Sequence, residues 1–568
     1  MVLCGVAGAA LNLCSVVSDC QAVRSLTNNR TTTPCDEAPC FERFAVNSTH
    51  AAAAALEGGT TIECDRVYGA ALPAAIAQNL TSVATLKRMV SFTLKTLIQA
   101  GMMDPLEKQP YAQIGLDVVG SEANTALSLE TAAQGTVLLR NDGGILPLAV
   151  GSVAKLLRVA VVGPMARARR EMAGDYWRCL CPAANGSHGV CDTWGHSDNI
   201  TAQCVPSIEE ALLAQALTKG GVTVTVEEGA DMSDPSCGFA VGEGHKCSEA
   251  GIATAAKLAG SDETDVVILA LGNSEWQNGW TAHENKDRMA IGLPGQQPQL
   301  VSVVLAAAKG KRKPIIAVLV NGGLASLDSL VAVPQQQQKL AIVEALLPGN
   351  TGATALANAL WGRTNTFGKL PFTMYPASFV EASDFADLSM SNPPGRSYKY
   401  YTGDALYEFS AGLSYTTFKL SSLSPDTTVL AVKLDATTDN GESWPKVSVV
   451  VTNTGTRAGD ECVFLWHNAS NVAAQQQQQH RTQIAAPPVP LKQLVDFQRI
   501  SLNPGESKTV EFQTSPSSVT TVDAVGRQLV LPGAHGLIVT RGAQHEAGLS
   551  LTLEVLALEP RVLSQLPL

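Results

Sequence analysis

The chain has 568 residues, with 40 Lys and Arg against 51 Asp and Glu, which gives a net charge of −11 at pH 7. Hydrophobic residues make up 45% and charged residues 16%, a balance typical of a folded chain long enough for about three or four domains. The acidic balance, the lack of a Lys/Arg cluster and an aromatic content of 5% argue against a nucleic-acid partner. No stretch approaches the ~20 apolar residues of a membrane helix, so no membrane partner is expected.

The 13 cysteines are distributed unevenly, and 12 of them precede residue 250. Six crowd one segment: Cys179, Cys181, Cys191, Cys204, Cys237 and Cys247. A zinc site is disfavoured, because no C-x-x-C pair repeats and His245 has no partner at ligand spacing. N-glycosylation sequons begin at Asn29, Asn47, Asn79, Asn185, Asn199 and Asn468. A disulfide framework therefore fits better, and it predicts a secreted, extracellular or cell-wall protein.

Residues 15–20 read Ser-Val-Val-Ser-Asp-Cys, which predicts a short strand that ends on a carboxylate. The carboxyl ends of parallel strands carry the chemistry of a β/α barrel, so Asp19 is a candidate catalytic residue. The alternative is that Asp19 is a turn former or a helix cap. Residues 2–17 also resemble a signal peptide, but Arg24 is the first positive charge, so the strand is preferred.

Residues from about 123 to 375 alternate between two kinds of pattern. Strands are predicted at Thr136–Leu139, Val159–Val162, Val222–Val226, Val266–Leu271 and Ile315–Val320, and helices at Ser207–Leu217, Ala250–Leu258 and Gln299–Ala308. This rhythm indicates an α/β layer with a mostly parallel sheet. An earlier helix is predicted over Ser82–Ala100, with its apolar residues on one face.

The C-terminal third has a different pattern. Residues 376–428 are rich in Pro, Gly and aromatic residues and predict a connector. Short alternating strands follow at Lys446–Thr452, Glu461–Trp466, Thr509–Gln513 and Gly536–Thr540. Turn signals separate them, so we expect a small antiparallel sandwich of the immunoglobulin or fibronectin type III kind.

Several longer stretches resemble glycoside hydrolase family 3, most of all its β-xylosidase branch. They read VVSDC at 16–20, GGTTIEC at 58–64, AAQGTVLLRNDGGILPL at 132–148, LPGNTGATALANALWGRTNTFGKLPFTMYP at 347–376 and PGRSYKYYTGDALYEFSAGLSYTTF at 394–418. The tail continues the resemblance with VVVTNTGTRAGDECVFLW at 449–466 and LVDFQRISLNPGESKTVEF at 494–512. The stretches occur in the order of the family and extend over nearly the whole chain. The resemblance implies retaining hydrolysis by two carboxylates, a nucleophile and an acid/base, ~5–5.5 Å apart. It assigns the nucleophile to Asp19.

The resemblance places the acid/base on the loop after the strand at 266–271. Relatives show Glu-x-Glu-x-x-Asp-Arg in this loop; here Asp287 and Arg288 match, and Glu284 matches the second glutamate. Ala282 holds the place of the first glutamate. We therefore expect Glu284 to be the acid/base, with Glu275 as the alternate.

The resemblance also predicts the domain organisation. Residues 1–110 are expected to be the remnant of a (β/α)8 barrel, 111–135 a linker, 136–375 an α/β sandwich domain, 376–428 the connector and 429–560 a fibronectin type III-like domain. A whole barrel takes about 250 residues. The earlier strands and their substrate-binding residues therefore have no counterpart in this sequence.

The implied function is that of an exo-acting β-D-xylosidase that releases terminal xylose, or arabinose, from xylan oligosaccharides. No metal, nucleotide or flavin cofactor is implied, and the oligomeric state is not predicted. One alternative is a β-glucosidase of the same family, although Cys20 stands where β-glucosidases have Trp. The other is a truncated, inactive carbohydrate-binding or interaction protein, which the missing barrel and Ala282 favour.

Overall fold

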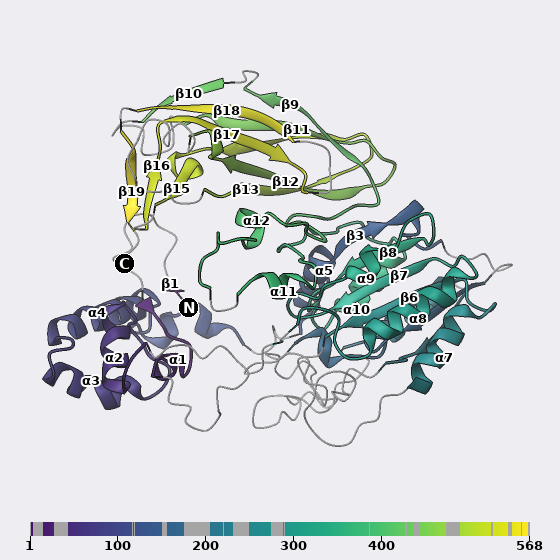
Figure 1. Cartoon of the computed structure of the whole chain (residues 1–568), viewed down its shortest axis with the longest axis horizontal. Helices are drawn as coiled ribbons and strands as arrows, with labels where there is room; N and C mark the ends of the chain where they lie inside the picture. Colours follow the sequence, from purple (N-terminus) through teal and green to yellow (C-terminus); the bar gives the residue numbers. More distant parts are fainter. Residues whose placement is uncertain are drawn as a thin grey trace.

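The structure is a computed structural model. It describes residues 2–3, 15–27, 44–115, 118, 120–149, 156–174, 205–219, 221–230, 249–273, 288, 290–384, 387–425, 429–434, 444–472, 489–523, 526–543, 548–557 and 559–565. Three units follow one another along the chain: an N-terminal helical unit, an α/β domain and a β-sandwich (Figure 1). In the part so described, no helix has both the length and the hydrophobicity that a membrane crossing requires.

The N-terminal unit contains one short stretch of parallel strand pairing. Its elements are β1 (Val2–Leu3), β2 (Ser15–Val16), α1 (Ala22–Ser25), α2 (Ser48–Glu57), α3 (Val67–Ala77) and α4 (Val83–Gln99). β1 and β2 are antiparallel, but Val17 pairs in parallel with Ile62, which follows α2. Small alanines of α2 pack with Leu56, Leu72 and Met89 in a buried cluster. Val17 and Ile62, which lie before α1 and after α2, are therefore paired in parallel at a single bridge, and the assignment of this unit to a barrel remnant stays a prediction.

The α/β domain is built on a six-stranded sheet. In chain order the strands are β3 (Val137–Asn141), β4 (Leu157–Val162), β5 (Val222–Glu227), β6 (Val266–Gly272), β7 (Ile315–Val320) and β8 (Leu340–Glu344). Their spatial order is β3-β8-β7-β6-β4-β5, and only the β3–β8 pair is antiparallel. The five predicted strands are confirmed to within about two residues. β8 was not predicted.

Helices cover both faces of this sheet. They are α5 (Glu122–Gly135), α6 (Ile208–Lys219), α7 (Glu249–Gly260), α8 (Gln297–Lys309), α9 (Asp328–Val331) and α10 (Gly352–Leu360). One core cluster joins a face of the sheet to α6 and α10, and the other joins the opposite face to α7, α8 and α9. The result is a three-layer α/β/α sandwich. α5 lies in the stretch expected to be a linker, and its Ser128 hydroxyl is bonded to Asn350 and Thr351 beside α10.

The connector, with α11 (Phe379–Ala382) and α12 (Ser397–Tyr400), leads into the β-sandwich. One sheet has five strands, in the order β10 (Val429–Lys433), β18 (Leu549–Leu556), β17 (Gly533–Thr540), β12 (Gly459–Asn468) and β13 (Gln493–Leu502). The facing sheet has β14 (Ser507–Gln513), β11 (Lys446–Asn453) and β9 (Phe418–Ser424). A third, small sheet has β15 (Thr520–Val522), β16 (Arg527–Val530) and β19 (Arg561–Gln565). The four predicted strands are confirmed, and the inward residues of both large sheets form one core.

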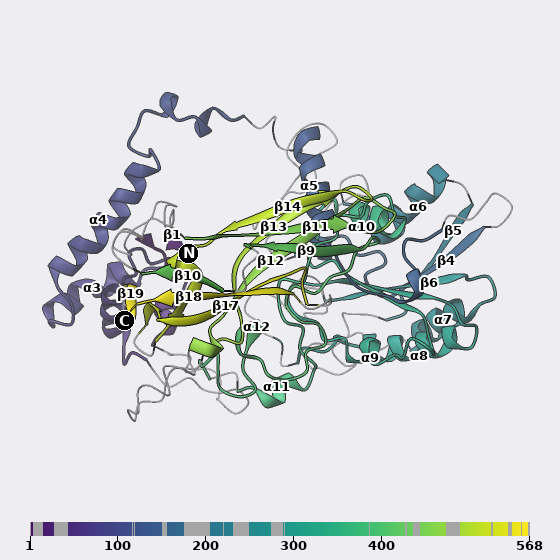
Figure 2. The same cartoon turned by 90° about the horizontal axis from the view of Figure 1, so that it is seen from above.

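The N-terminal unit and the α/β sheet lie at opposite ends of the molecule in both views (Figures 1 and 2). The β-sandwich extends along the side of the molecule and approaches both. Asp19 and the α/β domain therefore form two separate halves of the candidate site.

Candidate active site

Asp19 lies two residues beyond the parallel pairing of Val17 with Ile62, at the end of the strand. The Ser18 N–H donates to the Ile62 carbonyl at 2.9 Å, which fixes the strand end to its neighbour. The Asp19 carboxylate is exposed, and its Oδ1 accepts the N–H of Cys20 at 2.8 Å. The hydrogen bond orients one carboxylate oxygen, and the exposed side chain is accessible to a substrate, as a nucleophile must be.

A disulfide joins the two strand ends beside Asp19. Cys20 is bonded to Cys64, which follows the second parallel segment by two residues. The Cys64 N–H also donates to Ser18 Oγ at 3.3 Å. The residue after Asp19 is therefore held covalently against the neighbouring strand end. The sequence contained the signal for this pair, since both cysteines lie in the family-like stretches, but we did not predict their pairing.

The structure describes only part of the predicted disulfide framework. Cys462 is buried and not disulfide-bonded. The six crowded cysteines between residues 179 and 247 lie outside the described residues. One disulfide therefore supports the predicted framework, and its remaining members stay predictions.

The second half of the candidate site lies at the carboxyl edge of the parallel sheet. The buried Gln297 side chain accepts the Gly272 N–H at 2.9 Å and donates to the Gly272 carbonyl at 2.7 Å. The adjacent Asn273 side chain accepts from the Gly322 N–H at 3.0 Å and donates to its carbonyl at 3.2 Å. These two paired amides anchor the end of β6, where the segment with the acid/base candidates begins.

Glu284 and Glu275, together with Ala282 and Asp287, lie outside the described residues. Arg288, the last residue of the matched motif, is described. Its guanidinium donates to the carbonyl oxygens of Leu324, at 3.1 Å, and Gly292, and burial lowers its pKa below the ordinary value. Arg288 therefore acts here as a structural tie between loops at the sheet edge.

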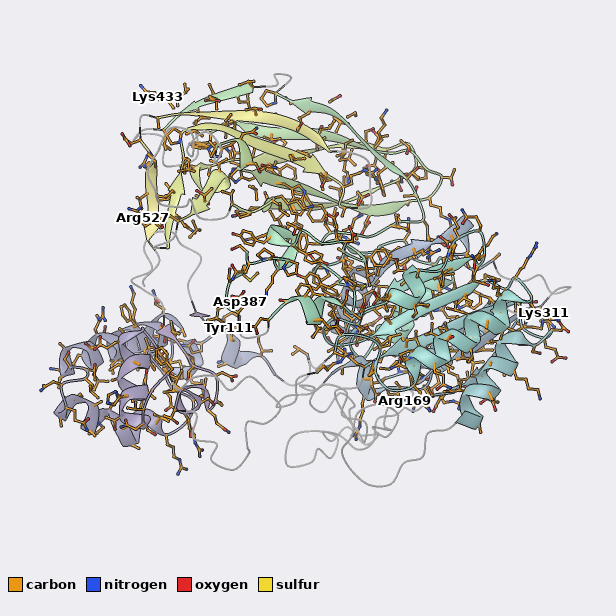
Figure 3. The ribbon with its side chains drawn as sticks, viewed as in Figure 1. Tyr111, Arg169, Lys311, Asp387, Lys433 and Arg527 are labelled. Atoms are coloured by element: carbon orange, nitrogen blue, oxygen red, sulfur yellow. A yellow bond between two sulfur atoms is a disulfide. The ribbon has the colours of Figure 1, made fainter. Side chains whose placement is uncertain are left out.

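The described residues do not bring Asp19 next to a second catalytic carboxylate. Arg169 follows the carboxyl end of β4, and Lys311 precedes the amino end of β7, so the two residues mark the two opposite ends of the parallel strands (Figure 3). In this view the carboxyl ends, marked by Arg169, are nearer to the N-terminal unit than the amino ends are. Across the described ranges, no group of three or more His, Cys, Asp or Glu side chains has an arrangement that could hold a metal ion.

Two domain families match this chain. The glycosyl hydrolase family 3 C-terminal domain matches residues 136–415, and the fibronectin type III-like domain matches residues 479–543. The chain belongs to glycoside hydrolase family 3. The α/β sandwich and the β-sandwich described above are these two domains of the family.

Two similar proteins are named as xylosidases. Beta-D-xylosidase 3 of Arabidopsis thaliana is 28% identical over 563 residues, which are 94% of this chain and 62% of that protein. A probable exo-1,4-beta-xylosidase of Aspergillus flavus is 30% identical over 510 residues, which are 88% of this chain and 56% of that protein. The chain therefore spans less than two thirds of the length of these relatives.

Two solved structures share the fold of this chain. An exo-beta-xylosidase in complex with a xylobiose aziridine activity-based probe matches with a TM-score of 0.71 and 25% identity, over 96% of this chain and 62% of that one. A β-glucosidase of Erythrobacter marinus matches with a TM-score of 0.66 and 25% identity, over 95% of this chain and 63% of that one.

Proposed function

We propose that this chain carries the C-terminal part of an exo-acting, retaining β-xylosidase that acts on xylan oligosaccharides. The observation that carries the proposal is the strand end at Asp19, with an exposed carboxylate next to the Cys20–Cys64 disulfide. Similarity to named xylosidases supports xylose as the sugar. A similar protein of Medicago sativa, named beta-xylosidase/alpha-L-arabinofuranosidase 2, supports arabinose as a second one.

In this mechanism Asp19 attacks the anomeric carbon and forms a covalent glycosyl-enzyme. Glu284, or Glu275 in its place, protonates the leaving oxygen and then removes a proton from the water that hydrolyses the intermediate. The two carboxyl groups must come within ~5–5.5 Å for this chemistry. That approach requires the N-terminal unit and the carboxyl edge of the α/β sheet to face one another across the sugar.

A single strand end cannot form a pocket around a sugar. We therefore expect full turnover only when the other strands of a barrel are present, supplied here from the Arabidopsis relative and fused ahead of residue 1. Positioning and electrostatic groups of a pocket contribute several orders of magnitude to rate, so the chain by itself should be slow or inactive.

Turnover of p-nitrophenyl-xyloside by the fused protein tests the assignment. Asp19→Asn keeps the shape of the side chain but removes the nucleophile, so we expect kcat to fall by ~10³-fold or more. Asp65→Asn is the matched control, because Asp65 is an exposed carboxylate near the same strand ends. Equal activity of the Asp19→Asn variant and the parent would show that Asp19 is not the nucleophile.

Separate Glu284→Gln and Glu275→Gln variants of the same fusion identify the acid/base. The true acid/base variant should lose the alkaline limb of the pH–rate profile, and added azide should restore its turnover by replacing water as the nucleophile. The other variant should keep the parent profile.

A β-glucosidase is the second candidate, and the similarity to solved β-glucosidases favours it. A glucosidase pocket must accommodate the extra hydroxymethyl group of glucose. A kcat/KM for p-nitrophenyl-glucoside above that for the xyloside would replace our proposal with this one. Binding of xylo-oligosaccharide without turnover in any form would favour the non-catalytic alternative.

We also propose that the protein is secreted to the extracellular space or the cell wall. The Cys20–Cys64 disulfide and the six sequons support an oxidising route. Treatment of the native protein with an endoglycosidase should reduce its apparent mass if the sequons are used. No change in mass would leave glycosylation without support.

A further inference from the structure

Glu344 is a carboxylic acid in the core of the α/β domain, and the proposed catalysis does not use it. It is the last residue of β8, between β7 and β3 in the sheet (Figure 1), and its exposed fraction is 0%. Its Oε1 accepts the N–H of Leu346 at 3.0 Å. The side chain of Asn321, the first residue after β7 and also 0% exposed, is hydrogen-bonded to the same carboxyl group.

The backbone ties these three residues into one unit. The Asn321 N–H donates to the Leu346 carbonyl at 3.1 Å, and Asn321 Nδ2 donates to the Gly323 carbonyl at 2.8 Å. Leu346 has a φ of +55°, in the left-handed region that a leucine rarely adopts, so its conformation depends on these contacts. The unit also adjoins Gly322, which Asn273 bonds to the end of β6.

Two buried oxygens in this unit have no hydrogen-bond donor. They are Glu344 Oε2 and Asn321 Oδ1. An ionised carboxylate only accepts hydrogen bonds, so it leaves both oxygens unsatisfied at a considerable cost in free energy. A protonated carboxyl group instead has an O–H donor beside the Asn321 amide. Protonation of the carboxyl group therefore removes the buried charge on an oxygen that no donor reaches.

Among the residues that the structure describes, none supplies a cation that compensates a charge on Glu344. The charged groups on the neighbouring elements are engaged elsewhere: Arg140 binds Asp142, and Arg288 binds carbonyl oxygens. Lys313 and Lys339 lie at the amino ends of β7 and β8, at the opposite edge of the sheet. Accordingly, burial raises the pKa of Glu344 to about 8.

We propose that Glu344 is a neutral acid in the folded protein and that its uncharged state maintains the hydrogen-bonded link between the ends of β7 and β8. Loss of the Glu344 proton in alkali opens the link at the sheet edge that also anchors β6. This inference concerns the fold of the α/β domain and does not depend on the proposed catalytic function.

The direction of the pH dependence follows from proton binding. Glu344 has an ordinary pKa of 4.5 in the unfolded chain and one of about 8 in the folded chain, so the folded state binds more protons between these values. Its contribution to stability is full below about pH 4.5, and it is lost as the pH rises through about 8. For one proton the opening equilibrium changes by up to ~tenfold per pH unit.

Hydrogen–deuterium exchange of the full chain from pH 5 to 9 tests this link. The probes are the peptides with the Asn321 and Leu346 amides, compared between the parent and Glu344→Gln. Glutamine keeps an N–H donor but cannot ionise, so the parent-to-variant ratio of exchange rates should rise with pH, by up to ~tenfold per unit. The comparison with the variant removes the intrinsic pH dependence of exchange. A ratio that stays constant would overturn the proposal.

Two further variants make the result specific. Glu344→Met removes the carboxyl group and supplies no hydrogen-bond donor in its place. Exchange in this variant should also lack the pH dependence of the parent, so the test remains possible if Glu344→Gln folds poorly. Glu227→Gln is the matched control, because Glu227 ends β5 of the same sheet but is only partly buried. Infrared spectroscopy at pH 7 should show a protonated carboxyl band in the parent that Glu344→Gln lacks; its absence from the parent would also overturn the proposal.

Discussion

His467 and His535 form a buried pair in the β-sandwich, with His467 Nε2 and His535 Nδ1 separated by 2.9 Å. His535 Nε2 lies 2.8 Å from the Leu531 carbonyl, which can only accept, so this nitrogen is the donor. His535 Nδ1 is then the acceptor, and His467 Nε2 donates to it. Both rings are neutral in this arrangement.

We expect this pair to make the β-sandwich acid-labile. Burial lowers the pKa of His467 to about 3, with a further contribution from His535, and burial also lowers the pKa of His535. Below the ordinary histidine pKa of about 6.5, the unfolded chain binds protons at these histidines but the folded chain does not. The stability of the folded state therefore falls as the pH decreases from 6.5 toward 3. The measurement is the unfolding midpoint of the sandwich between pH 7 and 4, followed by tryptophan fluorescence.

Two variants test whether the buried histidine pair causes this pH dependence. His467→Gln retains a donor at the position of Nε2 but does not titrate, so its midpoint should depend less on pH than that of the parent. His50→Gln is the control, since His50 is exposed on α2, and it should behave like the parent. A parent-like pH dependence of His467→Gln would refute the assignment.

At the scale of elements, the sequence allowed the central strands to be predicted because each is a run of β-branched and aliphatic residues between breaks. β6 and β7 are buried along their whole length and are bounded by polar or glycine-containing turns. β8 has five residues and follows a glutamine run, so its pattern was too short to recognise. β13 is only half-buried, and its mixed pattern also gave no clear strand signal.

The candidate site was predictable only in part. Asp19 could be placed at a strand end because that motif is local in the sequence. The anchoring amides of Asn273 and Gln297 and the acid at Glu344 could not, since their role depends on neighbours brought together by β6, β7 and β8. A buried polar residue acquires its function from tertiary packing, which periodicity does not encode.

Helix α4 shows a similar difference between pattern and packing. The predicted helix is confirmed over Val83–Gln99, but only Met89 is fully buried. Leu94 is 46% and Ile98 60% exposed, and Val83 and Val90 on the same side are exposed as well. An apolar stripe of this kind stabilises a helix only when another surface covers it.

We therefore expect the isolated chain to self-associate through α4. Leu94→Glu combined with Ile98→Lys replaces two stripe residues by an i,i+4 ion pair that keeps the helix, so it should shift the chain toward the monomer. Sedimentation velocity over a range of concentrations measures this shift. Leu388→Glu is the control, because Leu388 is 90% exposed but lies on the connector. Unchanged association of the double variant would show that another surface is responsible.

At the scale of the whole molecule, a buried group of charges on Lys369, Glu461 and Arg541 joins the α/β domain to the β-sandwich. Lys369 follows α10 at the end of the α/β domain, and its Nζ lies 2.7 Å from Glu461 Oε1 on β12. Arg541, just after β17, lies 3.2 Å from Glu461 Oε2. The exposed fractions of the Lys369, Glu461 and Arg541 side chains are 8%, 2% and 9%. One carboxylate therefore neutralises cations from both domains.

A second polar contact runs beside the first. Arg499 of β13 is paired with Asp460 at 2.7 Å and also donates to the carbonyl oxygens of Thr366, at 2.6 Å, and Phe367, at 3.3 Å. These two carbonyls belong to the segment that leads from α10 to Lys369. The interface is thus fixed by charge-assisted hydrogen bonds in a desolvated setting, where each partner is costly to remove.

Loss of the central carboxylate should therefore loosen the two domains from each other. Glu461→Gln leaves the cations of Lys369 and Arg541 buried without that carboxylate, and we expect the unfolding free energy to fall by about 3–5 kcal/mol. Urea unfolding measures the loss, and limited proteolysis should cut the connector between residues 387 and 417 sooner in the variant. Glu511→Gln is the matched control, because its pair with Lys446 is 3.6 Å long and both side chains are more than half exposed, so stability should be unchanged. If Glu461→Gln unfolds at the same urea concentration as the parent, this ion pair does not hold the two domains together.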